Sequence, residues 1–389
     1  MNKAVWGALV GIALATALML RVVALDRKPM HHDEANQAVR FGQLLETGHY
    51  AYDRADHHGP TLYYLTWPLA RLRGQSTLAS LDERTLRLVP AIFGTALILL
   101  YLPLVAGLGR TAIAVSAWLT ALSPALTYNS RAYIQEMVFA FFALAFLVAL
   151  GRFAERPRPA AALLAGVCGG LAYATKETSV IVIPAAIVAV LGAAWWRGAG
   201  WPRWRPRDLT LGVGAGVAVA VVFYSSFFTN PAGFVDSIRA FGVYVQRGLG
   251  ASPRLEAWDY YWRILAFSKS GGLFWSEAFI LVLALVGVST AFGRRFGGFW
   301  PSVLALYSVI SAAVFSAIPY KTPWNLVPFY VGVVLMAGVG AAALWRLARS
   351  RAARGLALAF FVVGCGHLGV ESWRASLVYP ADPRNPYVY

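Results

Sequence analysis

The chain has 389 residues, of which 58% are hydrophobic and only 13% are charged, and its formal net charge is +16. This composition excludes an ordinary soluble domain, and the apolar residues fall into blocks long enough to cross a bilayer, which takes about 17–25 residues. We predict a single all-α polytopic membrane domain over residues 1–389. Its eleven predicted transmembrane helices span residues 4–24, 87–107, 111–128, 132–151, 160–175, 178–196, 209–228, 273–292, 299–318, 323–345 and 355–370.

Basic residues gather in the loops on one side of this predicted topology. They are Lys3, Arg110, Arg152, Arg156, Arg158, Arg197, Arg203, Arg205, Arg207, Arg294, Arg295, Arg346, Arg349, Arg351 and Arg354. Only Glu155 and Asp208 share that side, whereas the other acidic residues and all six histidines fall on the opposite side. Because basic loops remain cytoplasmic, the opposite side is predicted to be extracytoplasmic. The positive charge is therefore a topology signal, and no nucleic-acid partner is expected. The Ala-, Arg- and Gly-rich composition favours a bacterial inner membrane.

The first outer loop, residues 25–87, is predicted to begin with a short amphipathic helix. Asp33 is a candidate cap for this helix, and Gly48 is a natural residue at its C-terminal end. An apolar face on such a helix favours a position along the membrane surface.

A second helix in the same loop is predicted to start at Pro60, a favourable first helical residue. His57 and His58 then lie directly before the helix N-terminus. Unpaired N–H groups and the helix dipole make such an end a suitable site for a phosphate group.

The second outer loop, residues 229–272, is rich in aromatic and basic residues such as Tyr261 and Trp262. It has two interpretations. The rings stack on sugars in a groove for the acceptor or the carrier, or they anchor the chain at the membrane interface.

Two adjacent carboxylates, Asp33 and Glu34, follow the first predicted span in the company of His31 and His32. A carboxylate at this place can act as a general base on an acceptor, while imidazoles and a helix N-terminus hold a departing phosphate. A polar cap on a short helix explains the same residues equally well.

Five motifs together resemble the glycosyltransferase-C superfamily. They are the acidic pair in HHDEANQA (31–38), DHHGPTLYY (56–64), SRAYIQEMVFAFF (130–142), KETS (176–179) and YKTPWN (320–325). Within the superfamily the chain looks like the branch of the protein O-mannosyltransferases and aminoarabinose–lipid A transferases, closest to the flippase-associated probable glycosyltransferases. The branch has a His-Pro-Pro or Lys-Pro-Pro motif before its second outer helix, and Gly59 replaces the first of these prolines here.

The resemblance implies transfer of a sugar from a polyprenyl-phosphate donor to a lipid, glycan or protein acceptor on the extracytoplasmic face. Carried over to this chain, Asp33 is the general base and Glu34 orients the neighbouring basic groups. The leaving lipid phosphate needs positive charge or N–H donors, since it departs as an anion. The predicted donor- and phosphate-binding residues are His57, His58, Arg131, Lys321 and Asn325.

Each of these ionisable residues also has a purely structural interpretation. Arg131 can form an ion pair with Glu136 that either orients the site or joins two helices. Lys176 and Glu177 can form a local salt bridge. Lys321 lies between aromatic residues and can serve as an interfacial anchor.

The two histidine pairs, His31-His32 and His57-His58, and several carboxylates in the first loop raise the possibility of a divalent metal. Their adjacent pairing differs from the i, i+4 spacing of a helical metal site, so we expect neither a metal site nor a required cofactor. Two other function classes remain open. A lipid or solute transporter should carry ionisable residues at mid-membrane depth, and a flippase-associated non-catalytic component should tolerate loss of Asp33.

Overall fold

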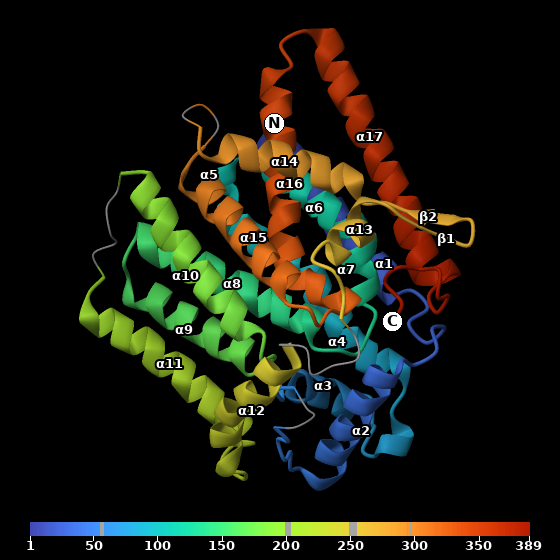
Figure 1. Cartoon of the computed structure of the whole chain (residues 1–389), viewed down its shortest axis with the longest axis vertical. Coiled ribbons are helices and arrows are strands. Elements are labelled where there is room, and N and C mark those ends of the chain that lie inside the picture. Colours follow the sequence, from blue (N-terminus) through green and yellow to red (C-terminus); the bar gives the residue numbers. More distant parts are fainter. Residues whose placement is uncertain (55–57, 199–203, 249–254, 294, 296) are drawn as a thin grey trace.

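The computed structural model describes residues 1–54, 58–198, 204–248, 255–293, 295 and 297–389. Figure 1 shows a bundle of long helices with shorter elements packed on one end. The helices are α1 Lys3–Val22, α2 His32–Thr47, α3 Thr61–Leu72, α4 Glu83–Ala96, α5 Val105–Leu108, α6 Arg110–Leu122, α7 Pro124–Asn129, α8 Glu136–Glu155, α9 Pro159–Tyr173, α10 Ser179–Trp196, α11 Pro206–Tyr224, α12 Ala232–Gly248, α13 Tyr260–Ala266, α14 Ala278–Ala291, α15 Phe299–Ala317, α16 Val327–Leu347 and α17 Arg351–Trp373. Short 3₁₀ or π turns η1 to η4 cover Leu78–Ser80, Leu97–Leu104, Pro323–Leu326 and Arg374–Val378, and strands β1 Ser268–Ser270 and β2 Leu273–Trp275 form an antiparallel hairpin.

The prediction of an all-α polytopic membrane protein is confirmed, and each predicted span coincides with helical structure in the part of the chain that is described. Eight helices are long and apolar enough to cross a membrane. Three shorter apolar helices, Arg110–Leu122, Pro159–Tyr173 and Ala278–Ala291, occupy the other predicted spans. The count of eleven spans therefore stays a prediction.

Prolines explain where the observed helices depart from the predicted spans. The predicted span 111–128 is broken at Ser123, because a residue before proline avoids helical geometry, and Ser123 instead caps α7 through its hydroxyl group. The predicted span 273–292 begins with strand β2, so its helix starts only at Ala278.

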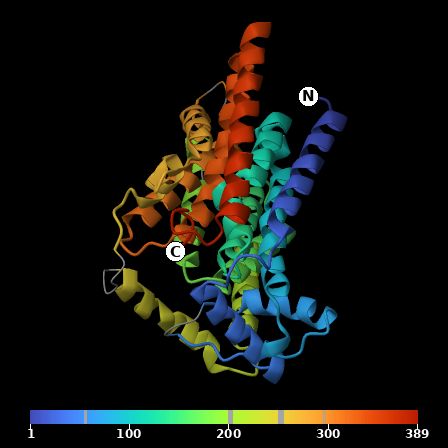
Figure 2. The same ribbon diagram turned by 90° about the vertical axis from the view of Figure 1, so that its right-hand side faces the viewer.

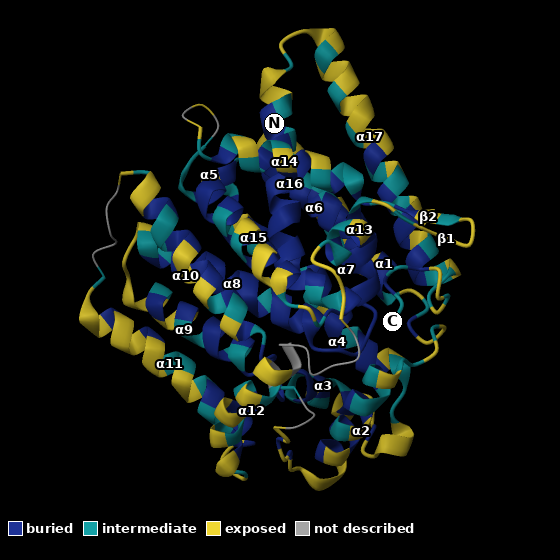
Figure 3. Cartoon of the chain, in the orientation of Figure 1, coloured by how far each residue is buried: buried dark blue, intermediate teal, exposed yellow. Residues whose placement is uncertain are grey.

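The two ends of the bundle differ in character. The N-terminus and the basic α16–α17 connection lie at one end, and α2, α3 and α12 lie at the other (Figures 1 and 2). Figure 3 shows that α8 and α16 are buried in the centre, whereas α17 is largely exposed. The predicted outer loop therefore packs as a folded cap on the end of the bundle opposite the N-terminus.

The second predicted outer loop contributes packing rather than an open aromatic groove among its described residues. The Tyr261 ring is buried against Phe329 of α16, and Trp262 packs on the same ring. Trp258 in this loop is 70% exposed. Both interpretations of the loop, a groove and an interfacial anchor, stay predictions.

Two arginines join α1 to the α6–α8 region. Arg21 is fully buried and donates to the Ser130 hydroxyl group at 3.0 Å and to the backbone of Thr120 at 2.8 Å. Arg131 donates in turn to the last carbonyl groups of the α1 region, at Leu20, Arg21, Val23 and Ala24. These carbonyls lack partners in a helix end, so the Ser130–Arg131 segment fixes the point from which the first outer loop starts.

Candidate active site

The N-terminus of α2 carries the acidic pair, but the capping residue is His31 rather than Asp33. The His31 Nδ1 atom accepts a hydrogen bond from the Asp33 backbone N–H at 3.1 Å. The Glu34 carboxylate accepts in return from the His31 backbone N–H at 3.2 Å, which completes a capping box. The prediction that Asp33 caps the helix was wrong, whereas Gly48 ends the helix in the left-handed region as predicted, with φ 71°.

Glu34 is fully buried and pairs with Arg87 of α4. Arg87 Nε lies 2.7 Å from Glu34 Oε1 and a second guanidinium nitrogen lies 3.0 Å from Oε2, so the pair is bidentate. The Tyr133 backbone N–H donates to the same carboxylate at 2.8 Å. Burial raises the pKa of Glu34, but the Arg87 hydrogen bond and the charges of Lys28 and Arg87 outweigh it and hold the pKa below its usual range.

Arg87 also fixes the loop that leads into α2. Its guanidinium donates to the backbone carbonyls of Leu25 at 2.6 Å, Lys28 at 2.8 Å and Pro29 at 3.4 Å. One buried side chain thus positions the loop, the helix N-terminus and the Glu34 carboxylate together.

Asp33 differs from Glu34 in its exposure to solvent and in the hydrogen bonding of its carboxylate. Its side chain is 36% exposed, and its carboxylate lies 3.9 Å from His31 Nδ1, too far for a hydrogen bond. The helix backbone around it is held rigidly by the capping box and by Glu34. Asp33 is therefore an accessible carboxylate on a fixed support, which is the arrangement a general base requires.

His58 lies before α3, as predicted, with Pro60 as the helix cap; His57 lies outside the described residues. His58 Nδ1 lies 2.7 Å from Glu177 Oε2, and Glu177 is buried. The Glu177 carboxylate thus holds the His58 ring in place at the start of α3.

Gly59 is explained by a close approach of two backbones. A Cβ atom at this position would lie 2.1 Å from the Ala174 carbonyl oxygen. The same oxygen accepts from the Thr61 hydroxyl group at 2.8 Å, which ties the start of α3 to the end of α9. Replacement of the family's first proline by Gly59 is a requirement of this contact.

A second cluster joins three segments that are distant in sequence. The Lys176 ammonium group pairs with the buried Glu136 carboxylate and donates to Asn325 Oδ1 at 2.9 Å. Glu136 is thus the partner of Lys176, and the prediction that it pairs with Arg131 was wrong. Lys176 and Glu177 do not pair with each other either, since each faces a different partner.

Two predicted phosphate-binding residues have other partners. Arg131 is buried and donates to the four carbonyl groups at the end of α1. The Lys321 ammonium group donates to the backbone carbonyls of Glu256, at 3.0 Å, and Ile318. These contacts give Arg131 and Lys321 structural roles, and phosphate binding by the predicted residues stays a prediction.

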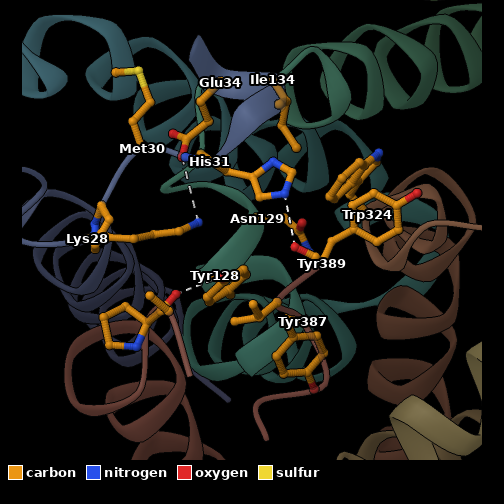
Figure 4. Close-up of a pocket in the computed structure, with 15 residues that line it drawn as sticks. Lys28, Met30, His31, Glu34, Tyr128, Asn129, Ile134, Trp324, Tyr387 and Tyr389 are labelled. Atoms are coloured by element: carbon orange, nitrogen blue, oxygen red, sulfur yellow. Dashed lines mark hydrogen bonds and ion pairs between the residues drawn. The ribbon is translucent and has the colours of Figure 1, made fainter. Parts of the chain in front are cut away.

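A cavity of about 220 Å³ lies beside Glu34 (Figure 4). It is bounded by the loop before α2, by α7 and by the C-terminal segment. Its lining residues are Lys28, Pro29, Met30, His31, Glu34, Tyr128, Asn129, Ala132, Ile134, Trp324, Pro380, Ala381, Tyr387, Val388 and Tyr389. The cavity brings together the first outer loop, the YKTPWN motif and residues near position 389.

Sequence reasoning missed Arg87, Lys28 and the C-terminal segment. Arg87 was visible as a charged residue at the start of a span, a position that commonly marks function or pairing. Lys28 and Tyr389 gave no such signal, because their role arises only from tertiary packing.

No group of three His, Cys, Asp or Glu side chains suited to a metal ion occurs among the residues with described positions. His57 lies outside that set. The expectation that no metal is required thus remains a prediction.

Residues 57–226 match a family model described as dolichyl-phosphate-mannose-protein mannosyltransferase. A search of the curated proteins found no match. Among solved structures, the oligosaccharyltransferase AglB from Archaeoglobus fulgidus, in complex with an inhibitory peptide and a dolichol-phosphate, matches with a TM-score of 0.66 and 13% identity over 98% of this chain. The chain spans 58% of the length of AglB.

Two further structures give the same result. ArnT from Cupriavidus metallidurans bound to undecaprenyl phosphate matches with a TM-score of 0.63 and 18% identity, over 99% of this chain and 75% of ArnT. The arabinofuranosyltransferase AftD from Mycobacteria matches with a TM-score of 0.52 and 15% identity, over 97% of this chain and 27% of AftD. The predicted resemblance is therefore confirmed at the level of the fold: the chain is a polytopic membrane protein with the glycosyltransferase-C fold.

Proposed function

We propose that this protein transfers a sugar from a polyprenyl-phosphate donor to an acceptor on the extracytoplasmic face of the membrane. The observation that carries the proposal is the division of roles between two adjacent carboxylates. Glu34 is buried and neutralised by Arg87, whereas Asp33 is accessible on the same rigid helix end. Two such carboxylates in different environments are a recurrent arrangement in acid–base catalysis.

In the proposed reaction, the acceptor hydroxyl oxygen attacks the anomeric carbon of the donor sugar. The bond from that carbon to the phosphate oxygen breaks, and the polyprenyl phosphate leaves with the bonding electrons. Asp33 takes the proton from the attacking hydroxyl group. Glu34 takes no part in the proton transfer and acts as a positioning residue through the helix end.

The leaving phosphate carries negative charge and requires positive groups that are already in place. His58 is backed by Glu177, and Lys176 is oriented by Glu136 and Asn325. Together with the N-terminus of α3 these groups form the proposed phosphate site. The undecaprenyl phosphate in ArnT and the dolichol-phosphate in AglB support a lipid phosphate as the ligand class.

The extracytoplasmic location is proposed from charge. The basic α16–α17 connection and the N-terminus lie at the end of the bundle opposite α2 and α3 (Figure 1). Because basic loops face the cytoplasm, the Asp33 end faces outward, and an inner membrane of a bacterium fits this arrangement.

The test uses the full chain purified in lipid nanodiscs with a panel of radiolabelled undecaprenyl-phosphate hexoses and pentoses. Wild type is expected to release undecaprenyl phosphate from at least one donor, with water replacing the acceptor, and Asp33→Asn is expected to lose this release. Asp236→Asn is the matched control, since Asp236 contacts only the exposed Arg239 among the described residues. Equal release by wild type and Asp33→Asn would remove Asp33 as the base, and binding of no donor by either protein would overturn the proposed function.

A further inference from the structure

The cavity beside Glu34 contains a buried cation whose hydrogen-bonding capacity is unused. The Lys28 ammonium group lies 3.9 Å from a Glu34 oxygen and 4.4 Å from the centroid of the Tyr128 ring. An N–O distance of 3.9 Å is too long for a hydrogen bond. The Lys28 side chain is only 11% exposed. Buried polar groups are nearly always hydrogen-bonded, so three N–H donors that point at a cavity indicate a missing ligand.

The charges around Lys28 leave an excess of positive charge. Glu34 is the only side-chain carboxylate among the lining residues, and Arg87 already holds it in a bidentate pair. Arg87 and Arg131 both repel the Lys28 cation, and burial together with this repulsion lowers the pKa of Lys28 to about 8. Lys28, Arg87 and Arg131 outweigh Glu34, so an anionic ligand would be stabilised here.

The remaining walls of the cavity are suited to a ring. The His31 and Trp324 rings lie 5.8 Å apart, and Trp324 and Tyr389 lie 4.7 Å apart, so aromatic side chains enclose one side (Figure 4). Asn129 adds an amide group to the lining. A volume of about 220 Å³ lies below the ~300–1,000 Å³ of pockets for drug-sized ligands, which limits the occupant to roughly one ring.

The C-terminal segment forms a fixed wall of the cavity. Tyr387 donates to the buried Glu277 carboxylate at 2.7 Å, and Tyr128 donates to the Pro380 carbonyl group at 2.9 Å. His31 Nε2 lies 3.0 Å from the Tyr389 backbone oxygen. Since His31 Nδ1 accepts from Asp33, this contact places the ring proton on Nε2. The same histidine thus joins the cavity wall to the helix turn that carries Asp33.

We propose that this cavity binds one sugar ring bearing a carboxylate or phosphate group, the anionic unit of the acceptor, with Lys28 as its recognition cation. The inference rests on the proposed function in that it assigns the ring to the acceptor. An acceptor held here lies next to the turn that carries Asp33. The cavity then selects the acceptor, and His58 with Lys176 holds the donor phosphate.

The test measures binding rather than turnover, so that it stands apart from the test of donor hydrolysis. The full chain in nanodiscs is treated briefly with a small amine-acylating reagent, and modification of Lys28 is quantified by peptide mass spectrometry. Lys269, exposed on β1, is the internal control. Ligands are glucuronate, glucose 6-phosphate, methyl glucoside, inorganic phosphate and undecaprenyl phosphate, at constant ionic strength.

Glucuronate or glucose 6-phosphate is expected to slow Lys28 labelling by about tenfold when present at about ten times its dissociation constant, because only the empty site reacts. Lys269 labelling should be unchanged. Trp324→Leu is expected to weaken this protection by about fivefold through loss of the ring contact, whereas Trp258→Leu, at an exposed position, should not.

Three results would overturn the assignment. Equal protection by methyl glucoside would remove the anion requirement, and equal protection by inorganic phosphate would remove the ring. Protection by undecaprenyl phosphate alone would show that the cavity binds the donor rather than the acceptor. Protection of Lys28 in the Asp33→Asn variant would support ligand binding in the cavity even if no donor is hydrolysed. The result of this test is thus separate from the result of the donor-hydrolysis test.

Discussion

Replacing Arg87 with methionine tests whether the buried pair with Glu34 organises the site. The change keeps an unbranched apolar stem but leaves the Glu34 carboxylate buried without its bidentate partner, and it leaves the carbonyls of Leu25 and Lys28 without their donor. Loss of one member of a buried pair costs about 3–5 kcal/mol, because an uncompensated charge remains. We expect the free energy of unfolding to fall by that amount.

The assay is unfolding by SDS titration in mixed micelles, followed by far-UV circular dichroism. The matched control is Arg84→Met on the same helix, because the Arg84–Asp26 pair is exposed at 63% and 41% of the two side chains. Exposed pairs contribute about 0–1 kcal/mol, so this variant should remain close to wild type. The double variant Glu34→Gln/Arg87→Met should recover part of the loss, since no buried charge is left unpaired.

The reasoning would be refuted by an Arg87→Met cost below about 1 kcal/mol, equal to that of the exposed pair. It would also fail if the double variant were no more stable than Arg87→Met alone, because the cost would then not come from the isolated Glu34 charge.

Three other outcomes are expected. Gly59→Ala should reduce both stability and donor hydrolysis, because its Cβ would lie 2.1 Å from the Ala174 oxygen. Gly7→Ala, whose Cβ would have no atom within 4 Å, should change neither property. Thermal unfolding measures the stability, and release of undecaprenyl phosphate measures the hydrolysis. Burial, and to a smaller extent repulsion by Arg87 and Arg131, lowers the pKa of Lys28 from 10.5 to about 8. Between these two pH values the unfolded chain binds more protons than the folded chain. The stability of the wild type should therefore rise with pH across that window. The rise should be on the order of 3 kcal/mol relative to Lys28→Met, measured by unfolding at pH 7.5 and 10.5; a pH-independent difference would contradict it. Donor hydrolysis should survive treatment with EDTA, and a loss restored by one divalent metal would show that a metal is required.

The arrangement of the spans could be predicted because apolar blocks and arginine-rich loops are properties of the sequence alone. Gly48 correctly indicated the C-terminal end of α2, and Pro60 indicated the start of α3. The breaks inside spans were harder to predict. The interruption at Ser123 depends on a single proline, and strand β2 consists of apolar residues that the predicted span 273–292 included.

The site could be predicted only in part, because its contacts join positions that are far apart in sequence. The motifs identified Asp33, Glu34 and His58. They did not identify Arg87, which pairs with Glu34 although it lies fifty-three positions later in the sequence. Proximity in sequence favoured Arg131 as the partner of Glu136. Arg131 instead precedes the helix and turns back to α1, which leaves Glu136 to Lys176. Only the packed bundle decides between such partners.

The Arg21 contacts also bear on the order of events during synthesis. Arg21 lies in the last turn of α1, yet its partners Thr120 and Ser130 lie 99 and 109 positions later. At about 5–20 residues per second, the ribosome needs on the order of 5–20 s to supply them. Until then the guanidinium must remain at the lipid–water boundary, since the centre of the bilayer costs about 2.5–3.5 kcal/mol for arginine on insertion scales. The first helix is thus held in a provisional position by its own charge and reaches its final depth only when the third predicted span arrives.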